Sequence, residues 1–581
     1  MFIVFKKLSW FFRLEWKRYT IAIILLNICG FIEVIPPRLI GNAIDGIHTG
    51  TMSMERLTHL LFLYGGLIVA SYILTYVWIY KLFGGSIVLE RLLRSKLMRH
   101  LLKMTPTFYE RNRTGDLMAR ATNDLTAVST TAGFGILTLV DSTVYMCTIL
   151  GMMGFLISWK LTLAALIPLP LMAYIMGKLG NQIHGRFMRA QDAFGDMNDR
   201  VLETIAGVRV IRAFVQETAT EQRFQDMTTD VYRKNIAVTQ IDSLFEPIVK
   251  ILVSASYLIG LCYGGYLVFH SQLTPGELVT FNVFLGMLIW PMMAIGELIN
   301  VMQRGNASLD RVNETLGYKP DVVDHEGHEE LKRPETIIFD QVSFRYPSST
   351  VDNLIQISLT LKQGQTLGIV GKTGSGKTTL LRQLLREYPL GQGTISISDI
   401  PLQQLNTDNI HGWLGYVPQQ PVLFSKTIRE NILLGGQNAT EDELQNALEL
   451  ASFSKEMKYL PDGIHTLVGE KGVALSGGQK QRVSIARALI ANPEILILDD
   501  ALSAVDAKTE TKIVQGIRNQ RAGRTTLITT HRLSAVQHAD WIIVMDEGAI
   551  IEEGTHDHLV QQNGWYREQY DRQQIEAQIE A

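Results

Sequence analysis

One short stretch constrains the fold of this chain more than any other. Residues 371–378 read G-K-T-G-S-G-K-T, the phosphate-loop pattern of two glycines with four residues between them, followed by Lys and Thr. The apolar run 367–370 precedes the stretch and predicts a buried strand, and leucines at helical spacing follow it. Strand, glycine-rich loop and helix in this order predict an α/β domain that binds phosphate, and a chance glycine turn is the weaker alternative.

The residue types in this loop suit a nucleotide. Glycines let backbone N–H groups curl around phosphate oxygens without Cβ clashes, and the following helix N-terminus adds a partial positive charge. Lys377 can reach the β- and γ-phosphates, and the Thr378 hydroxyl can ligate Mg²⁺. The sequence therefore predicts that this loop binds a magnesium nucleotide.

Composition places the chain between a soluble enzyme and a membrane bundle. The 581 residues are 46% hydrophobic and the mean hydropathy is +0.11. We therefore expect a membrane part and a soluble part. The net charge of −3 gives no support to a nucleic-acid partner, and none is expected.

The first half predicts a helical membrane bundle. Its first residues mix basic and aromatic side chains, typical of an amphipathic helix at the bilayer interface. Pro36 and Pro37 fall late in the first apolar segment and should kink it. Six segments are each near the roughly 20 residues that a span needs: 19–40, 57–80, 134–157, 161–179, 248–269 and 278–301.

The connections between these spans differ in length and charge. Those after the second and fourth spans are long and rich in Lys and Arg, whereas the others are short and poor in them. The positive-inside rule places the long connections and the N-terminus in the cytoplasm. Their apolar spacing predicts that the helices continue beyond the membrane. Each contains a glycine beside a short apolar cluster, 108–117 and 203–214, which is either a plain helical turn or a foot that docks on a cytoplasmic domain.

Six ionisable residues fall within or near the spans, where charge is costly and usually faces a cavity or a pairing partner. Intra-bundle pairing and contact with a transported substrate are both open for them. We single out Asp141 and Glu297 as candidates for a substrate cavity. The six residues are Glu33, Asp141, Asp242, Glu246, Lys250 and Glu297.

The second half predicts an α/β ATPase. Hydropathy falls after Gly305, and residues 318–335 are charged and flanked by proline, as in a linker. Short β-branched runs then alternate with helical patterns. We therefore expect an interfacial elbow helix (1–18), a transmembrane domain with six spans and two long cytoplasmic extensions (19–317), a linker (318–335) and a nucleotide-binding ATPase domain (336–581).

Four further motifs follow the phosphate loop. Gln419 lies in Y-V-P-Q-Q-P-V-L-F, residues 475–479 read L-S-G-G-Q, residues 495–500 read I-L-I-L-D-D, and His531 lies in I-T-T-H-R. Carboxylates at the end of a strand beside a nucleotide suit a Mg²⁺ ligand and a base that orients water. Alone, a motif of this kind could be a glycine turn or a core strand with a polar end. The probability that all of them occur together in this order by chance is negligible.

Together these motifs resemble the ABC transporter superfamily, specifically an exporter half-transporter with six spans and one nucleotide-binding domain. The resemblance implies ATP and Mg²⁺ as cofactors. It also implies that Tyr346, in F-R-Y-P, stacks on adenine. The ATP-binding loop would comprise Gly371, Lys372, Thr373, Gly374, Ser375, Gly376, Lys377, Thr378 and Thr379. The signature, which would contact the ATP of a partner subunit, would comprise Leu475, Ser476, Gly477, Gly478 and Gln479.

The resemblance implies further roles near the γ-phosphate. Thr378, Gln419 and Asp499 would hold Mg²⁺, and Asp500, His531 and Gln419 would serve catalysis. Glu470 would belong to the cross-linking loop of exporters, residues 503–506 to a dimer-contact loop, and the two glycine-containing clusters to coupling helices.

One residue departs from the family pattern. The resemblance makes Asp499 the Walker B aspartate. The family normally carries Glu at the next position, whereas this chain has Asp500. Asp is shorter by one methylene, roughly 1.5 Å of reach, and a misplacement of about 1 Å can cost on the order of 10²-fold in rate. A weak Walker B beside an intact signature is typical of one half of a heterodimeric exporter with one impaired site.

We interpret the chain as one half of an ATP-driven exporter of amphipathic, drug-like molecules in the cytoplasmic membrane. Its expected partner is a second half-transporter subunit, with a heterodimer favoured over a homodimer. One alternative is a homodimeric lipid flippase, which Asp500 disfavours because both sites would then be weak. Another alternative is a protein of the same fold that does not pump. In such a protein, ATP binding would open a channel or regulate a partner.

Overall fold

The protein forms two compact units. The structure, a computed structural model, describes residues 3–324, 331, 333–469 and 473–580. The first unit comprises Met1–His100 and Gly115–Gly317, and the second comprises Leu101–Thr114 and Tyr318–Ala581. Part of the predicted linker and the predicted cross-linking residue Glu470 lie outside the described residues.

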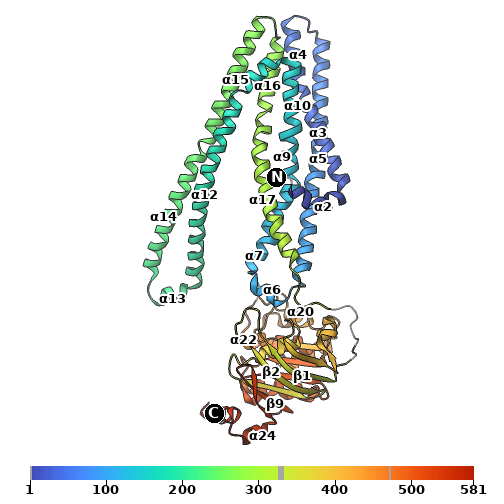
Figure 1. Cartoon of the computed structure of the whole chain (residues 1–581), viewed down its shortest axis with the longest axis vertical. Coiled ribbons are helices and arrows are strands. Elements are labelled where there is room, and N and C mark those ends of the chain that lie inside the picture. The colour runs from blue at the N-terminus through green and yellow to red at the C-terminus, as the bar shows by residue number, and fades with distance from the viewer. Residues whose placement is uncertain (1–2, 325–330, 332, 470–472, 581) are drawn as a thin grey trace. The chain divides into compact units, whose positions relative to one another are not determined.

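The described residues of the first unit form helices joined by short turns (Figure 1). Its helices are α1 (Ile3–Lys7), α2 (Ser9–Leu14), α3 (Trp16–Glu33), α4 (Ile35–His48), α5 (Met54–Leu101), α7 (Thr114–Ala119), α8 (Leu125–Ala132), α9 (Phe134–Val140), α10 (Met146–Gly151), α11 (Trp159–Leu166), α12 (Pro168–Ala206), α13 (Val208–Ala213), α14 (Glu217–Asp242), α15 (Phe245–Phe269), α16 (Pro275–Met287) and α17 (Ile289–Gly317). Three π-helical stretches interrupt them, at Arg120–Asp124, Asp141–Tyr145 and Met152–Ser158.

Five continuous helical runs among the described residues are long and apolar enough to cross a membrane. One of them, Thr114–Ala206, has 93 residues and contains both the third and the fourth predicted spans. Ser158 divides this run, because its backbone is extended (φ −166°) and its hydroxyl caps α11 by accepting from the Leu161 N–H. The run therefore holds two spans joined by a tight turn, which agrees with the short, weakly charged connection in the sequence.

The first span bends at the predicted position. Helix α3 ends at Glu33 and α4 begins at Ile35, with proline in the first turn of α4. Pro36 and Pro37 cannot donate the backbone hydrogen bonds that would continue α3. The predicted kink is therefore confirmed.

The helices also extend well beyond the predicted spans. Helix α5 continues to Leu101, and α12 and α14 run side by side (Figure 1). The Arg186 guanidinium on α12 donates to the Ala237 carbonyl on α14 at 2.8 Å. At their shared end, α13 has no buried side chain, and Val208 and Val210 are exposed.

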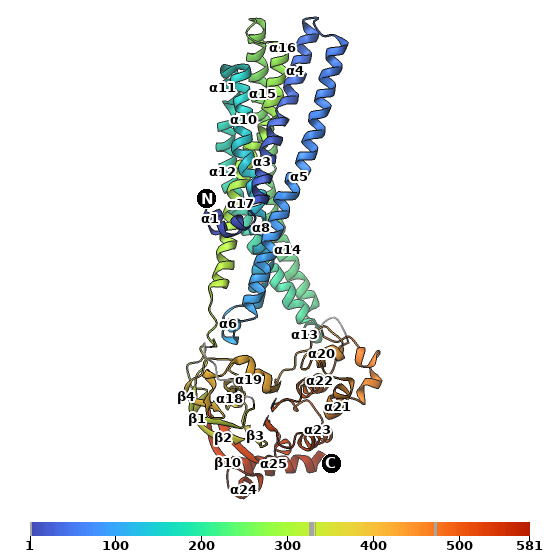
Figure 2. The ribbon, with the colours of Figure 1, turned by 90° about the vertical axis from the view of Figure 1, so that its right-hand side faces the viewer.

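The described residues of the second unit form two sheets (Figure 2). The antiparallel sheet has the order β2-β1-β4-β5, and the larger sheet has the order β10-β9-β3-β8-β7-β6, parallel except for β10. The strands are β1 (Thr336–Phe344), β2 (Leu354–Lys362), β3 (Thr366–Gly371), β4 (Gln392–Ile397), β5 (Ile400–Pro401), β6 (Leu414–Val417), β7 (Ile495–Asp499), β8 (Thr525–Thr529), β9 (Trp541–Asp546) and β10 (Ala549–Gly554).

Helices connect and cover these strands. They are α18 (Lys377–Leu384), α19 (Thr407–Trp413), α20 (Ile428–Leu433), α21 (Glu441–Leu450), α22 (Gly477–Leu489), α23 (Ala507–Gln520), α24 (His556–Gln561) and α25 (Trp565–Glu580). The central strands β7 and β8 are buried throughout. A parallel sheet between helices is the predicted α/β domain.

A short helix from the long first connection also belongs to this unit. Helix α6 (Pro106–Arg111) buries Phe108, whose ring meets that of Tyr318 edge-on at 5.0 Å. Glu110 accepts a hydrogen bond from the Tyr388 hydroxyl. The first glycine-containing cluster is therefore a foot that docks on the ATPase domain rather than a free helical turn.

In the first unit, a glycine sets the contact between α8 and α17. A Cβ at Gly305 would lie 1.8 Å from the buried Thr131 Oγ1, which itself donates to the Val301 carbonyl at 3.2 Å. Only a residue without a side chain permits this approach. Gly296, on the same helix, has open space at its Cβ position.

Alanine substitutions at these two glycines should distinguish the effect of packing on stability from the effect of helix propensity. We expect Gly305→Ala to lower stability by about 1–3 kcal/mol because the new methyl group overpacks the contact. The effect should appear as a lower Tm of the purified protein. Gly296→Ala should leave the Tm unchanged or raise it slightly, since alanine favours helix. Equal losses in both variants would contradict this role for Gly305.

Candidate functional site

The phosphate loop follows β3 directly and is held by its glycines. Gly371, Gly374 and Gly376 have φ of +147°, +83° and +101°, a region that L side chains rarely adopt. A Cβ at Gly371 would lie 2.1 Å from the Met545 carbonyl oxygen. The loop therefore requires glycine for both conformation and space. It leads into the N-terminus of α18, where the first-turn N–H groups of a helix can bind an anion.

Lys377 lies inside this loop. Its ammonium donates to the carbonyl oxygens of Gly371 at 2.8 Å and Lys372 at 2.7 Å. Burial lowers the pKa of Lys377, while the carboxylates of Asp500 and Asp499 oppose that shift. A bound polyphosphate would place negative charge beside the buried ammonium and stabilise its charged form.

Asp499 ends β7 with a carboxylate that fits a metal ion. The side chain is 1% exposed, and its Oδ1 accepts from the Thr529 and Thr378 hydroxyls at 2.7 and 3.0 Å. Its other oxygen, Oδ2, is buried and has no hydrogen-bond partner among the described residues. A buried carboxylate oxygen without a donor is costly unless a cation binds it. Asp499 and Thr378 are thus suited to Mg²⁺, which prefers carboxylate and hydroxyl oxygens.

Asp500, Gln419 and His531 lie beside this carboxylate. The Gln419 amide donates to Asp500 Oδ2 at 3.4 Å. Asp500 has φ +47°, a left-handed conformation, stabilised by its N–H donating to the Thr529 carbonyl and hydroxyl. Burial raises the pKa of Asp500, and nearby His531 and the bond from Gln419 lower it. Burial also lowers the pKa of His531.

Tyr346 lies over the start of α18. Its hydroxyl donates to Thr379 Oγ1 at 3.1 Å, and its ring meets Tyr388 edge-on at 4.9 Å. The Tyr388 hydroxyl in turn donates to Glu110 on α6. The residue predicted to stack on adenine therefore lies two contacts from the docked foot.

The signature opens another helix in the same unit. The Ser476 hydroxyl caps α22 by accepting from the Gln479 N–H, and the Gln479 side chain accepts from the Ser476 N–H. Gly477 and Gly478 form the first turn of this helix. The N-terminus of a 13-residue helix with two glycines admits a close anion. The predicted contact with a partner's ATP stays a prediction.

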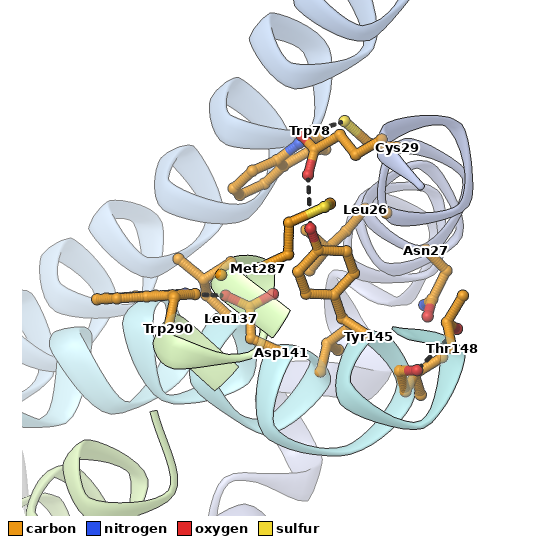
Figure 3. Close-up of a pocket in the computed structure, with 15 residues that line it drawn as sticks. Leu26, Asn27, Cys29, Trp78, Leu137, Asp141, Tyr145, Thr148, Met287 and Trp290 are labelled. Atoms are coloured by element: carbon orange, nitrogen blue, oxygen red, sulfur yellow. Dashed lines mark hydrogen bonds between the residues drawn. The ribbon is translucent and has the colours of Figure 1, made fainter. Parts of the chain in front are cut away.

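A cavity in the first unit contains one of the two predicted intramembrane residues. It has a volume of about 430 Å³, within the range of pockets for drug-sized ligands. Asp141 lines it and accepts from the Trp290 indole N–H at 2.8 Å (Figure 3). Glu297 is exposed and does not line this cavity.

The cavity also contains residues that the sequence did not single out as ligands. Glu33 lines it and accepts from the Tyr145 hydroxyl at 3.3 Å. Tyr145 and Asp141 both project from the π-helical stretch Asp141–Tyr145 (Figure 3). Trp78 is 8% exposed, and its indole N–H has no partner among the described residues. The only signal in the sequence was the presence of Glu33 within a span.

The charge of this cavity is one-sided. Among its described lining residues are two carboxylates and no Lys, Arg or His. Three aromatic residues, Trp78, Tyr145 and Trp290, share its wall. Aromatic faces and carboxylates both attract organic cations. The cavity thus suits an amphipathic molecule with a positive charge.

Comparisons with known proteins agree with the geometry. The sequence matches the family described as "ABC transporter transmembrane region" over residues 19–292 and that described as "ABC transporter" over residues 354–503. The "Probable multidrug resistance ABC transporter ATP-binding/permease protein YheI" of Bacillus subtilis is 63% identical over 99% of this chain and 98% of its own length. The "Multidrug resistance-like ATP-binding protein MdlA" of Escherichia coli is 44% identical, with 99% and 98% covered.

A solved structure resembles the whole chain. It is described as the "Structure of a bacterial Atm1-family ABC exporter with ATP bound" and superposes with a TM-score of 0.80. The two sequences are 25% identical, and the match covers 96% of this chain and 99% of that one. The likeness thus extends over both the helical unit and the ATPase unit.

The two lysines of the phosphate loop provide a matched test of nucleotide binding. We expect Lys377→Ala to weaken ATP binding to this chain by about tenfold or more, because a buried charge on the phosphates is lost. Lys372→Ala should change binding far less, since the Lys372 ammonium points to Asp546 at 3.0 Å. Photolabelling of this chain with an ATP analogue measures both. Unchanged labelling in Lys377→Ala would show that its assigned role is wrong.

Proposed function

The chain belongs to the ABC transporter family as an exporter half-transporter, and we propose that it exports amphipathic, drug-like molecules as one half of a heterodimer. It is a multi-pass membrane protein with an ATPase domain, and a half-transporter works as a dimer. The observation behind the proposal is that strands β3, β6, β7 and β8 deliver Lys377, Gln419, Asp499 and His531 to one edge of one sheet.

The proposed reaction is cleavage of the γ-phosphate of ATP. Lys377 and the loop N–H groups hold the phosphates, and Thr378, Asp499 and Gln419 would hold Mg²⁺, which neutralises charge on the β- and γ-oxygens. Asp500 and His531 are proposed to orient the attacking water and the γ-phosphate. The signature of a partner subunit would complete this site, while Ser476 and Gly478 of this chain would complete the partner's site.

Cleavage at this chain's own site is proposed to be slow. Asp500 lacks one methylene relative to the family's Glu, and its backbone is held by both bonds to Thr529, so the carboxylate has little freedom to advance. The proposed partner is a different half-transporter, BmrD-like, that supplies a Walker B with Glu. A homodimeric lipid flippase would instead contain two weak sites, and an ATP-gated regulator would show no ATP-driven transport.

We propose that the membrane cavity is part of the substrate path. Closure of the nucleotide sites would act on the bundle through α6, whose Glu110 is bonded to Tyr388. The positive-inside pattern supports an orientation with the N-terminus, the helical extensions and the ATPase domain in the cytoplasm. Export from the cytoplasm then follows from that orientation.

The carboxylates of the cavity should govern selection by charge. We expect Glu33→Gln and Asp141→Asn to reduce transport of a cationic substrate by about tenfold, because an ion pair between the cavity carboxylate and the substrate is lost, and to spare its neutral analogue. Glu297→Gln is the matched control, since this exposed residue lies outside the cavity. Transport of both substrates is measured in vesicles. Equal loss for both would indicate a structural role.

The two ATP sites should respond differently to mutation. Asp500→Asn should leave the ATPase rate of the complex within about twofold, because little chemistry depends on this residue. Ser476→Ala should cut the rate by about tenfold or more, because a phosphate contact at the competent site is lost. If the transporter were instead a homodimer with two equal sites, Asp500→Asn would abolish turnover.

A capping control removes an ambiguity in this test. Ser476 also caps α22, and loss of a cap costs about 1 kcal/mol. Thr440 caps α21 with the same reciprocal pattern, so Thr440→Ala should lose the cap and keep the ATPase rate. Gly478→Asp would not isolate the phosphate contact, because its Cβ would also clash with the Ala504 carbonyl oxygen at 2.7 Å. If Asp500→Asn is as inactive as Ser476→Ala, the proposed impaired site is wrong.

A further inference from the structure

A second polar cavity lies in the ATPase domain, away from the phosphate loop. It has a volume of about 210 Å³ and is lined by residues from the start of β3, the start of β8 and the end of α23. The phosphate loop follows the opposite, carboxyl end of β3. Thr366 in the cavity and the phosphate loop therefore lie at opposite ends of β3.

The cavity gathers positive charge. Arg518, Arg521, Arg524 and His538 line it, and Asp540 is the one carboxylate among its described lining residues. Asp540 already accepts from the Thr366 N–H at 2.7 Å. The three guanidinium groups therefore outnumber the carboxylate that could neutralise them.

Arg521 is the buried member of this group. The side chain is 5% exposed, and its two terminal nitrogens donate to the carbonyls of Pro493 at 2.9 Å and Thr525 at 3.1 Å. Its Nε is buried and has no hydrogen-bond partner among the described residues. Burial, and secondarily Arg524, lowers the pKa of Arg521 to about 10. A buried N–H without an acceptor on a charged side chain is costly, and a nearby anion would offset part of that cost.

Other donors in the cavity are also uncommitted. Arg518 is exposed and forms no hydrogen bond or ion pair among the described residues, and the Thr366 and Thr526 hydroxyls make no hydrogen bond there either. Burial, and secondarily Arg518, lowers the pKa of His538. Guanidinium and hydroxyl donors around a small space match a tetrahedral oxyanion with several acceptor oxygens.

We propose that this cavity, built by Arg518, Arg521 and His538 with the threonine hydroxyls, binds a phosphate group. Its volume suits inorganic phosphate or a small phosphomonoester and falls below that of drug-sized pockets. The ligand would accept from Arg518 and the threonine hydroxyls, would lie beside the buried Arg521 guanidinium, and would balance the cations at the end of α23. The site is separate from the ATP site and does not depend on the proposed export function.

Binding of radiolabelled inorganic phosphate to the purified full transporter tests the proposal. An ATP analogue that cannot be cleaved first fills the nucleotide sites, so that phosphate cannot enter them. We expect saturable binding, with one phosphate per copy of this chain. Arg518→Gln should raise the Kd by about tenfold, because a charge-assisted hydrogen bond is lost. Lys512→Gln is the matched control, since this exposed lysine lies on the same helix and does not line the cavity.

The outcomes are distinct. Arg518 forms no hydrogen bond or ion pair among the described residues, so Arg518→Gln should fold normally, and an unchanged Tm verifies this. Competition by glycerol phosphate would assign the site to phosphomonoesters, such as a headgroup, as well as free phosphate. Failure of that competitor with phosphate still bound would assign it to free phosphate. Absence of saturable binding, or equal weakening in both variants, would overturn the proposal.

Discussion

The parallel pairing of β3, β8 and β7 is the constraint on which the ATP site depends. It places the ends of three strands at one edge, so the phosphate loop, Asp499 and His531 meet although they are far apart in the chain. Thr529, at the end of β8, then bonds to both Asp499 and Asp500. The same pairing brings the start of β3 beside the start of β8, where the second cavity opens.

Much of this arrangement was predictable from the sequence. Spacing and residue type predicted the phosphate loop, because Gly371 and Gly376 occupy conformations that other residues rarely adopt. Pro36 and Pro37 predicted the break after α3, because proline lacks the N–H that would continue the helix. The resemblance to ABC exporters supplied the family and the expected order of domains, which the comparisons support.

The membrane cavity was not predictable in the same way. Asp141 and Tyr145 face it from a π-helical stretch, where the rotation per residue departs from the ordinary helical period. Periodicity therefore could not show that they share a wall with Glu33. Glu297 met the same criterion in the sequence as Asp141, yet only Asp141 lines the cavity. In the same way, the cavity at Arg521 depends on unused donors that appear only once the strands are paired.

The central claim is that ATP cleavage in the dimer that contains this chain drives outward movement of an amphipathic molecule. Uptake into inside-out vesicles containing this chain and its partner subunit tests it most directly, because export from the cytoplasm becomes accumulation inside. The account predicts accumulation of an amphipathic cation that requires ATP and stops when an uncleavable analogue replaces it. Cation flux that is equal with ATP and with the analogue, or no accumulation with active ATPase, would contradict the account.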